Sequence, residues 1–271
     1  MELLPEERIP IYHAHLERKP RDAAIWFDLG LAHKILHEWE DCARANSRAL
    51  EIRNRRGDPA WWNLGIAATG MRDWATARRA WRGYGIDRIR EGDGPIEDDF
   101  GQTPVRLPHG EVVWGKRIDP ARVKIENIPF PESGYRWGDV VLHDGAPNGE
   151  RLVHGRTYSV FDVLERWSPS EVPTFVLHTE GASDRDRLEL IATFEQNHFA
   201  AEDWTSNVRS LCRACSTGQP GHTHPAASEG EDYHSFGIAC PMGLAAALLE
   251  QWSATSPKSR RYEWAVSSDS E

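Results

Sequence analysis

Two short stretches, Trp26-Phe27-Asp28-Leu29-Gly30 and Trp61-Trp62-Asn63-Leu64-Gly65, decide the fold of the first third of the chain. Both read W-x-x-L-G, and they lie 35 residues apart. Each is followed 16 positions later by a small residue, Cys42 or Ala77. Similarity at a fixed period of this length is typical of stacked helix-turn-helix units. In such units the glycine and the small side chain let the two helices approach closely.

The repeated motif resembles the tetratricopeptide repeat, a helix-turn-helix unit of about 34 residues. Residues 6–18 resemble the second helix of a preceding unit, and Pro20 stands where a proline customarily follows that helix. The resemblance covers residues 6–90 and implies a TPR-like domain, residues 1–90, of about two and a half units. Because roughly three units are needed for a stable array, we expect this array to depend on the residues that follow it.

The resemblance also implies a protein-binding groove, because such arrays hold peptides or partner helices on the face formed by the first helix of each unit. The residues expected on that face are Phe27, Leu31, Lys34, Trp62, Asn63 and Ile66. Chaperone-tail recognition is not implied, since the clamp lysine and asparagine of the first unit are replaced by Phe27 and Leu31. Burial of the same face against the next domain remains an alternative.

Charge is divided unevenly along the 271 residues, whose net charge is −10. Residues 1–90 carry 16 Lys and Arg against 13 Asp and Glu, and residues 91–271 carry 16 against 29. The acidic excess argues against a nucleic-acid partner. The split indicates either two solvated surfaces, or docking of the first part on the second part or on an acidic partner.

Several features predict a cytoplasmic protein without a membrane segment. The most apolar run, residues 243–249, is far shorter than the roughly 20 residues that a membrane helix needs. The N-terminus is acidic and interrupted by Pro5, which is not the pattern of a secretory signal. Four cysteines suit a reducing compartment better than a disulfide framework.

The next two segments differ from the first in pattern. Residues 91–104 are acidic and rich in Gly and Pro, which predicts a linker, and its bulky residues Ile96 and Phe100 are expected to dock on the repeat.

Residues 105–171 contain four runs rich in β-branched and aromatic residues between turn formers, which predicts a small β-barrel or strongly curved sheet. His143-Asp144 in this module is a weak candidate for catalysis, because its surroundings are ordinary hairpin material.

Residues 172–271 follow the order strand, helix, strand, strand, helix, strand, which is that of a ferredoxin-like β-α-β-β-α-β domain. This arrangement hosts many functions and therefore implies none. The predicted architecture is thus an α+β multidomain chain with a helical repeat, a small β module and a ferredoxin-like domain.

An insertion at residues 212–234 of that domain carries a candidate metal site. Two cysteines three residues apart and two histidines two residues apart supply the soft ligands that tetrahedral zinc favours. The predicted ligands are Cys212, Cys215, His222 and His224, with His234 in reserve. Four protein ligands close a site, so we expect a structural zinc ion; a free thiol pair is the alternative.

The sequence therefore favours a non-enzymatic adaptor that binds a protein or peptide partner through the repeat, although it leaves an enzymatic function possible. One alternative is a zinc-dependent hydrolase centred on residues 212–234, with Glu229 or Asp232 as general base. Another is an RNA- or ribosome-associated factor whose Arg-rich array meets phosphate.

Overall fold

The structure is a computed structural model of the whole chain, and it describes residues 3–153, 155–205, 233–256 and 260–265. These residues form a mixed α and β protein with seven α-helices and two sheets. They divide into two compact units. The first comprises residues 1–101 with the short segments 117–123 and 142–146, and the second comprises residues 102–116, 124–141 and 147–271.

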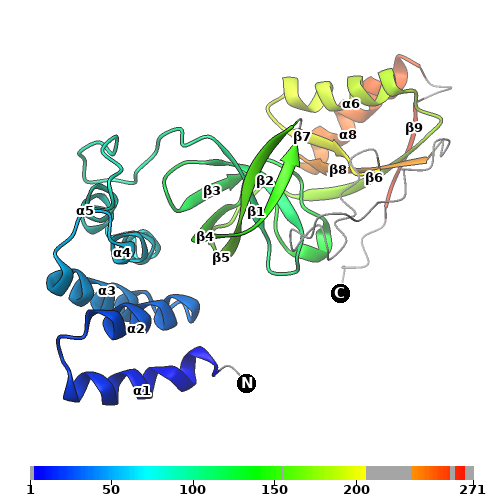
Figure 1. Cartoon of the computed structure of the whole chain (residues 1–271). Coiled ribbons are helices and arrows are strands. Elements are labelled where there is room, and N and C mark those ends of the chain that lie inside the picture. Colours follow the sequence, from blue (N-terminus) through cyan, green and yellow to red (C-terminus); the bar gives the residue numbers. More distant parts are fainter. Residues whose placement is uncertain (1–2, 154, 206–232, 257–259, 266–271) are drawn as a thin grey trace. The chain divides into compact units, whose positions relative to one another are not determined.

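Five helices form the N-terminal part and fit a helical repeat (Figure 1). They are α1 (Pro5–Arg18), α2 (Ala23–Ile35), α3 (Trp39–Arg53), α4 (Pro59–Gly70) and α5 (Trp74–Tyr84). Aspartates define three of the helix starts, because the carboxylates of Asp22, Asp58 and Asp73 accept backbone N–H groups in the first turns of α2, α4 and α5.

The repeated glycines lie where the helices of a pair cross. A Cβ at Gly30 of α2 would overlap Asn46 of α3, and a Cβ at Gly65 of α4 would overlap the ring of Trp81 of α5. The small residues Cys42 and Ala77 are fully buried. The W-x-x-L-G motif therefore marks close helix packing, as its spacing predicts.

The middle of the chain forms a closed five-stranded barrel in the order β1-β2-β3-β4-β5, so the predicted small β-barrel is confirmed. The strands are β1 (Gln102–Arg106), β2 (Val112–Arg117), β3 (Arg122–Ile125), β4 (Val140–Val153) and β5 (Arg156–Ser168), with a short 3-10 helix η1 (Pro131–Ser133) before β4. β1 and β5 pair in parallel. In an up-and-down order of five strands the first and last run the same way, so closure brings them together in parallel.

The C-terminal part consists of a four-stranded sheet and two helices. Its elements are β6 (Thr174–Glu180), α6 (Asp184–Gln196), β7 (Ala200–Asp203), β8 (Tyr233–Ala239), α8 (Met242–Ala254) and β9 (Arg261–Trp264). The sheet order is β7-β8-β6-β9, and every neighbouring pair is antiparallel. No described helix is long and apolar enough to span a bilayer.

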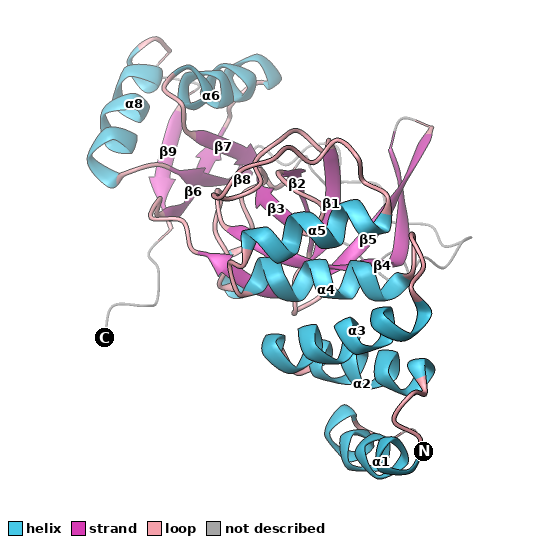
Figure 2. Ribbon diagram, turned by 90° about the vertical axis from the view of Figure 1, so that its left-hand side faces the viewer, coloured by secondary structure: helices cyan, strands magenta, loops and turns pink. Residues whose placement is uncertain are grey.

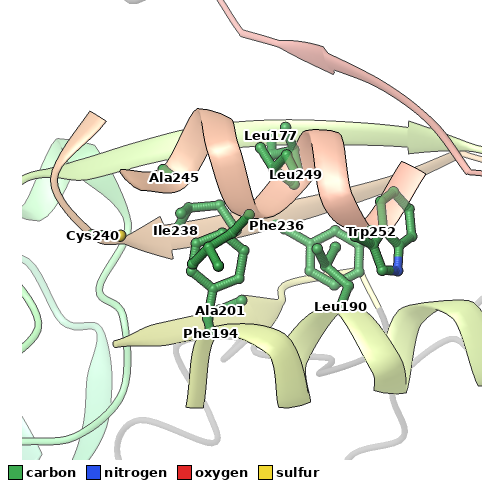
Figure 3. Close-up of a cluster of buried hydrophobic side chains, with 11 residues drawn as sticks. Leu177, Leu190, Phe194, Ala201, Phe236, Ile238, Cys240, Ala245, Leu249 and Trp252 are labelled. Atoms are coloured by element: carbon green, nitrogen blue, oxygen red, sulfur yellow. The ribbon is translucent and has the colours of Figure 1, made fainter. Parts of the chain in front are cut away.

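Helices α6 and α8 lie side by side over this sheet (Figure 2). Their apolar faces meet the sheet in one buried cluster, in which Phe194 of α6 and Leu249 of α8 approach Phe236 of β8 (Figure 3). Cys240 lies in the same cluster as a small buried residue. Burial of these large side chains is the main favourable term for this part of the chain.

Candidate functional site

Trp62 of α4 packs against Gly145 of β4, and residues 142–146 belong to the same compact unit as α4. The indole of Trp62 lies so close to Gly145 that any Cβ at residue 145 would overlap it. Trp62 is also held by edge-to-face contacts with Trp81 and Tyr84, at centroid distances of 5.1 and 4.8 Å. The aromatic residue predicted to meet a partner therefore packs on the chain's own backbone.

A buried ion pair fixes the same segment to α2. Nζ of Lys34 lies 2.7 Å from Oδ1 of Asp144, and Lys34 is only 3 % exposed. The same carboxylate oxygen accepts the backbone N–H of Gly145 at 2.6 Å. Asp144 thus both shapes its own turn and neutralises a buried lysine, which would be costly to leave unpaired.

Asn63 and Ile66, which were also predicted to line the groove, are buried as well. In this structure four of the six predicted partner-binding residues pack inside the first unit. The accessible remainder of the inner face lies on α2, where Phe27 and Leu31 are half-buried. On α4, Asn63 and Ile66 are thus buried and Trp62 is packed on Gly145, while partner binding by these residues stays a prediction.

Ile35 extends this accessible part and was not among the predicted residues. Its side chain is 50 % exposed at the last position of α2. Phe27, Leu31 and Ile35 are spaced by four residues, which places them on one side of the helix; we call these three residues the α2 strip. Arg53 lies beside it, with its guanidinium 5.5 Å from the centre of the Phe27 ring. The four-residue spacing from Leu31 is the feature of the sequence that could have predicted Ile35 as part of this strip.

The His143-Asp144 pair does not form a catalytic arrangement. Nδ1 of His143 lies 2.6 Å from the main-chain oxygen of Asp144, whose carboxylate is engaged by Lys34. Burial, aided by the charge of Arg117, lowers the pKa of His143 to about 3. The imidazole is therefore neutral near pH 7 and serves as a packed polar group.

The predicted linker lies against α5 in this structure. Arg78 donates hydrogen bonds to the main-chain oxygens of Gly94 at 2.7 Å and Pro95 at 3.4 Å, and Ile96 is buried. Phe100 lies beneath the guanidinium of Arg88, 3.8 Å from the ring centre. The arginines of this region thus bind main-chain oxygens and an aromatic ring of the first unit.

The prediction of a zinc cofactor is wrong: among the residues that the structure describes, no group of three or more His, Cys, Asp or Glu side chains could hold a metal ion. The predicted ligands lie outside those residues, as do the two candidate general bases: Cys212, Cys215, His222, His224, Glu229 and Asp232. The described cysteines, Cys42 and Cys240, are buried, and burial raises the pKa of their thiols to about 12 and about 11. They are therefore protonated, whereas a metal binds the thiolate.

The surroundings of His234, the reserve ligand, do not suit a metal cation. Nδ1 of His234 lies 3.2 Å from Oδ2 of Asp203. The same oxygen lies 3.2 Å from Nε of Arg187. Because a permanently charged guanidinium already neutralises this carboxylate, the cluster offers a metal ion little negative charge.

No known family model matches the sequence, and no curated protein matches it.

Proposed function

We propose that this protein is a non-enzymatic adaptor that binds a protein partner through the α2 strip of its helical repeat. The observation that carries the proposal is the accessibility of this strip, in which Phe27 and Leu31 are half-buried and Ile35 is half-exposed. An apolar row of this kind suits the apolar side of an amphipathic segment of another protein.

Charge specifies the partner further. Residues 1–90 carry a net charge of +3, and Arg53, which pairs with the buried Asp58 at 3.1 Å, is still partly exposed beside Phe27. The expected partner is therefore an amphipathic segment with acidic residues beside its apolar ones, since opposite charges favour association and correct register.

The finer architecture belongs to the same proposal. We infer that α2 to α5 are two tetratricopeptide units, which is supported by the close helix crossings at Gly30 and Gly65. We also infer a ferredoxin-like C-terminal domain, supported by the sheet order β7-β8-β6-β9 with antiparallel neighbours. A cytoplasmic location is proposed from the cysteine usage, and the described Cys42 and Cys240 are free thiols.

Site-specific photocrosslinking tests the proposal. A benzophenone amino acid replaces Phe27 in the full chain, and in a control protein it replaces Leu188, which is 67 % exposed on α6. After irradiation in the source cells, the expected result is a crosslinked peptide unique to position 27 that carries apolar and acidic residues. Introducing Ile35→Glu should abolish this crosslink, because it replaces an apolar contact with a carboxylate that would face the acidic partner.

The proposal is wrong if positions 27 and 188 yield the same products, or if Ile35→Glu leaves the crosslink at position 27 unchanged. A crosslinked peptide rich in Lys and Arg would contradict the charge argument alone.

A further inference from the structure

The four-stranded sheet of the C-terminal part has one face turned away from α6 and α8. Leu177 of β6 and Phe236 of β8 belong to the core cluster under those helices (Figure 3). Neighbours along a strand point to opposite faces, so His178 and Ser235 lie on the other face, where the register places them opposite each other. The register also places Glu263 of β9 opposite His178. This face therefore carries polar residues of three adjacent strands side by side.

A cavity of about 120 Å³ opens at one end of this sheet, where β6 ends and where β8 and β9 begin. Its lining consists of residues 178–180, Tyr233 and residues 261–263. Pockets for molecules of drug size have volumes of about 300–1,000 Å³. The cavity at the end of the sheet therefore admits the end of a single side chain or a group of similar size.

One wall of the cavity is an aromatic shelf that β6 and β8 form together. The rings of His178 and Tyr233 stack with their centroids 4.9 Å apart and their planes 27° from parallel. Nδ1 of His178 lies 3.0 Å from Oγ of Ser235, which holds the imidazole on the sheet. Tyr233 is 44 % exposed. An exposed phenol ring that is supported in this way offers its electron-rich face to a cation or to a planar group.

The charged residues around the shelf favour a cation. Nη1 of Arg261 lies 3.9 Å from Oε2 of Glu180, and both side chains are about two-thirds exposed, so these two charges offset each other in a loose surface pair. Glu263 accepts a hydrogen bond from Tyr233, which is one of about four that a carboxylate can accept. Partial burial and this carboxylate raise the pKa of Tyr233, so its ring stays neutral near pH 8. The excess charge beside the ring is therefore the carboxylate of Glu263.

We propose that this cavity binds the guanidinium group of an arginine side chain in a partner peptide. A guanidinium is planar, stacks on aromatic rings and donates paired hydrogen bonds to a carboxylate. The cavity supplies both elements, the ring of Tyr233 and the carboxylate of Glu263, in a volume of the size of one side chain. The site belongs to the second compact unit, whereas the α2 strip belongs to the first, so neither proposal depends on the other.

Nuclear magnetic resonance titration of the full chain at pH 8, with labelled tyrosine and histidine rings, tests the proposal. The probe is the blocked tripeptide acetyl-Gly-Arg-Gly-amide, and it should shift the ring signals of Tyr233 and His178 with a dissociation constant of about 0.1–1 mM. The same peptide with citrulline, which has the shape of arginine without its charge, should bind at least about fivefold more weakly. Inorganic phosphate should leave both rings unshifted.

Variants at exposed positions identify the groups that hold the guest, with the signals of His178 as the readout. Glu263→Gln should weaken binding by about fivefold, whereas Glu195→Gln at an exposed carboxylate of α6 should leave it unchanged. Tyr233→Leu should weaken binding by about three- to fivefold, and Tyr233→Phe, which keeps the ring, should retain it within about twofold. Arg261→Gln should strengthen binding by about twofold, because it removes a charge of the same sign as the guest.

The direction of the Arg261→Gln effect separates this proposal from an anion site. Weaker binding in this variant, or ring shifts caused by phosphate instead of the arginine peptide, would overturn the assignment of a cationic guest. Equal affinity for the arginine and citrulline peptides would overturn it as well. An arginine peptide that leaves both rings unshifted at about 10 mM, well above the expected dissociation constant, would show that the cavity is not a guanidinium site.

Discussion

Helices α2 and α4 occupy the same position in two consecutive units, yet their inner faces have different surroundings. Phe27 and Trp62 are equivalent positions 35 residues apart, as are Leu31 and Ile66. On α4 Trp62 packs on Gly145 and Ile66 is fully buried. On α2 Phe27 packs against the neighbouring core, and it and Leu31 remain half-buried with no contact of this kind from residues 142–146 among the described ones. The comparison shows that the repeat motif specifies how the helices cross, while the course of a distant segment decides which of the equivalent aromatic side chains it packs on.

The largest expected difference comes from truncating the aromatic residue at the equivalent position of each helix. Trp62→Ala removes the ring that covers Gly145 and contacts Trp81, so it should destabilise the protein by about 3–5 kcal/mol. Phe27→Ala at the more accessible position should destabilise it by only about 1–2 kcal/mol. Urea denaturation of the two variants measures both values, and equal losses would contradict the distinction between the helices.

The next largest loss of stability is expected where Gly145 closely approaches Trp62. Gly145→Val introduces atoms where the indole already lies, so the segment must shift and stability should fall by about 3 kcal/mol. Gly94→Ala is the matched control in the same unit, because no atom lies within 4 Å of its built Cβ. Thermal unfolding should show a large drop for the first variant and little change for the second.

The buried ion pair that joins Lys34 of α2 to Asp144 of β4 should contribute somewhat less to stability than the packing at Gly145. Lys34→Met leaves Asp144 without its cation, and because that carboxylate is partly exposed we expect a loss of about 2–3 kcal/mol. Arg48→Ala breaks an exposed pair with Glu51 in the same array and should change stability by about 0.5 kcal/mol or less. If both variants lose the same stability, the ion pair does not fasten the segment.

The Lys34–Asp144 contact also explains what sequence reasoning missed. The two residues are 110 positions apart, and neither has a neighbour pattern that points to the other. The close packing at Gly30 and Gly65, by contrast, was predictable because the glycines recur at one period, although the residues that they face are Asn46 and Trp81 rather than the small residues Cys42 and Ala77. Periodic local patterns predict elements and their crossings, whereas a single long-range charge pair leaves no periodic trace.

The same distinction applies to the rest of the candidate site. The runs of β-branched and aromatic residues predicted the barrel, but not that Gly145 of β4 would pack against Trp62 of α4. The resemblance to the tetratricopeptide repeat implied that Phe27 and Leu31 lie on the groove face, and one more four-residue step along the helix would have added Ile35. The zinc prediction relied on the types and local spacing of two cysteines and two histidines, and the described part of the chain provides no such cluster.

The covered face should also respond to pH through His143. Burial lowers the pKa of this histidine from its usual 6.5 to about 3, so the folded state favours the neutral imidazole. Its stabilising effect is fully present above pH 6.5 and is lost as the pH falls towards 3, by up to about 1.4 kcal/mol per pH unit. The diagnostic window is pH 5 to 6.5, above the ordinary titration of most carboxylates. His143→Gln should remove most of this slope, and an unchanged slope would contradict the assignment.

The smallest effect on stability belongs to the open end of the α2 strip. Ile35 is half-exposed, so Ile35→Ala should change the free energy of unfolding by about 1 kcal/mol or less. Its effect on partner capture should be much larger than its effect on stability, because a bound segment would bury the side chain that the free protein exposes. Crosslinking from position 27, compared with urea denaturation of the same variant, measures both quantities. A variant that keeps its stability and loses the crosslink places Ile35 in a binding surface, whereas parallel losses would make α2 a structural helix like α4.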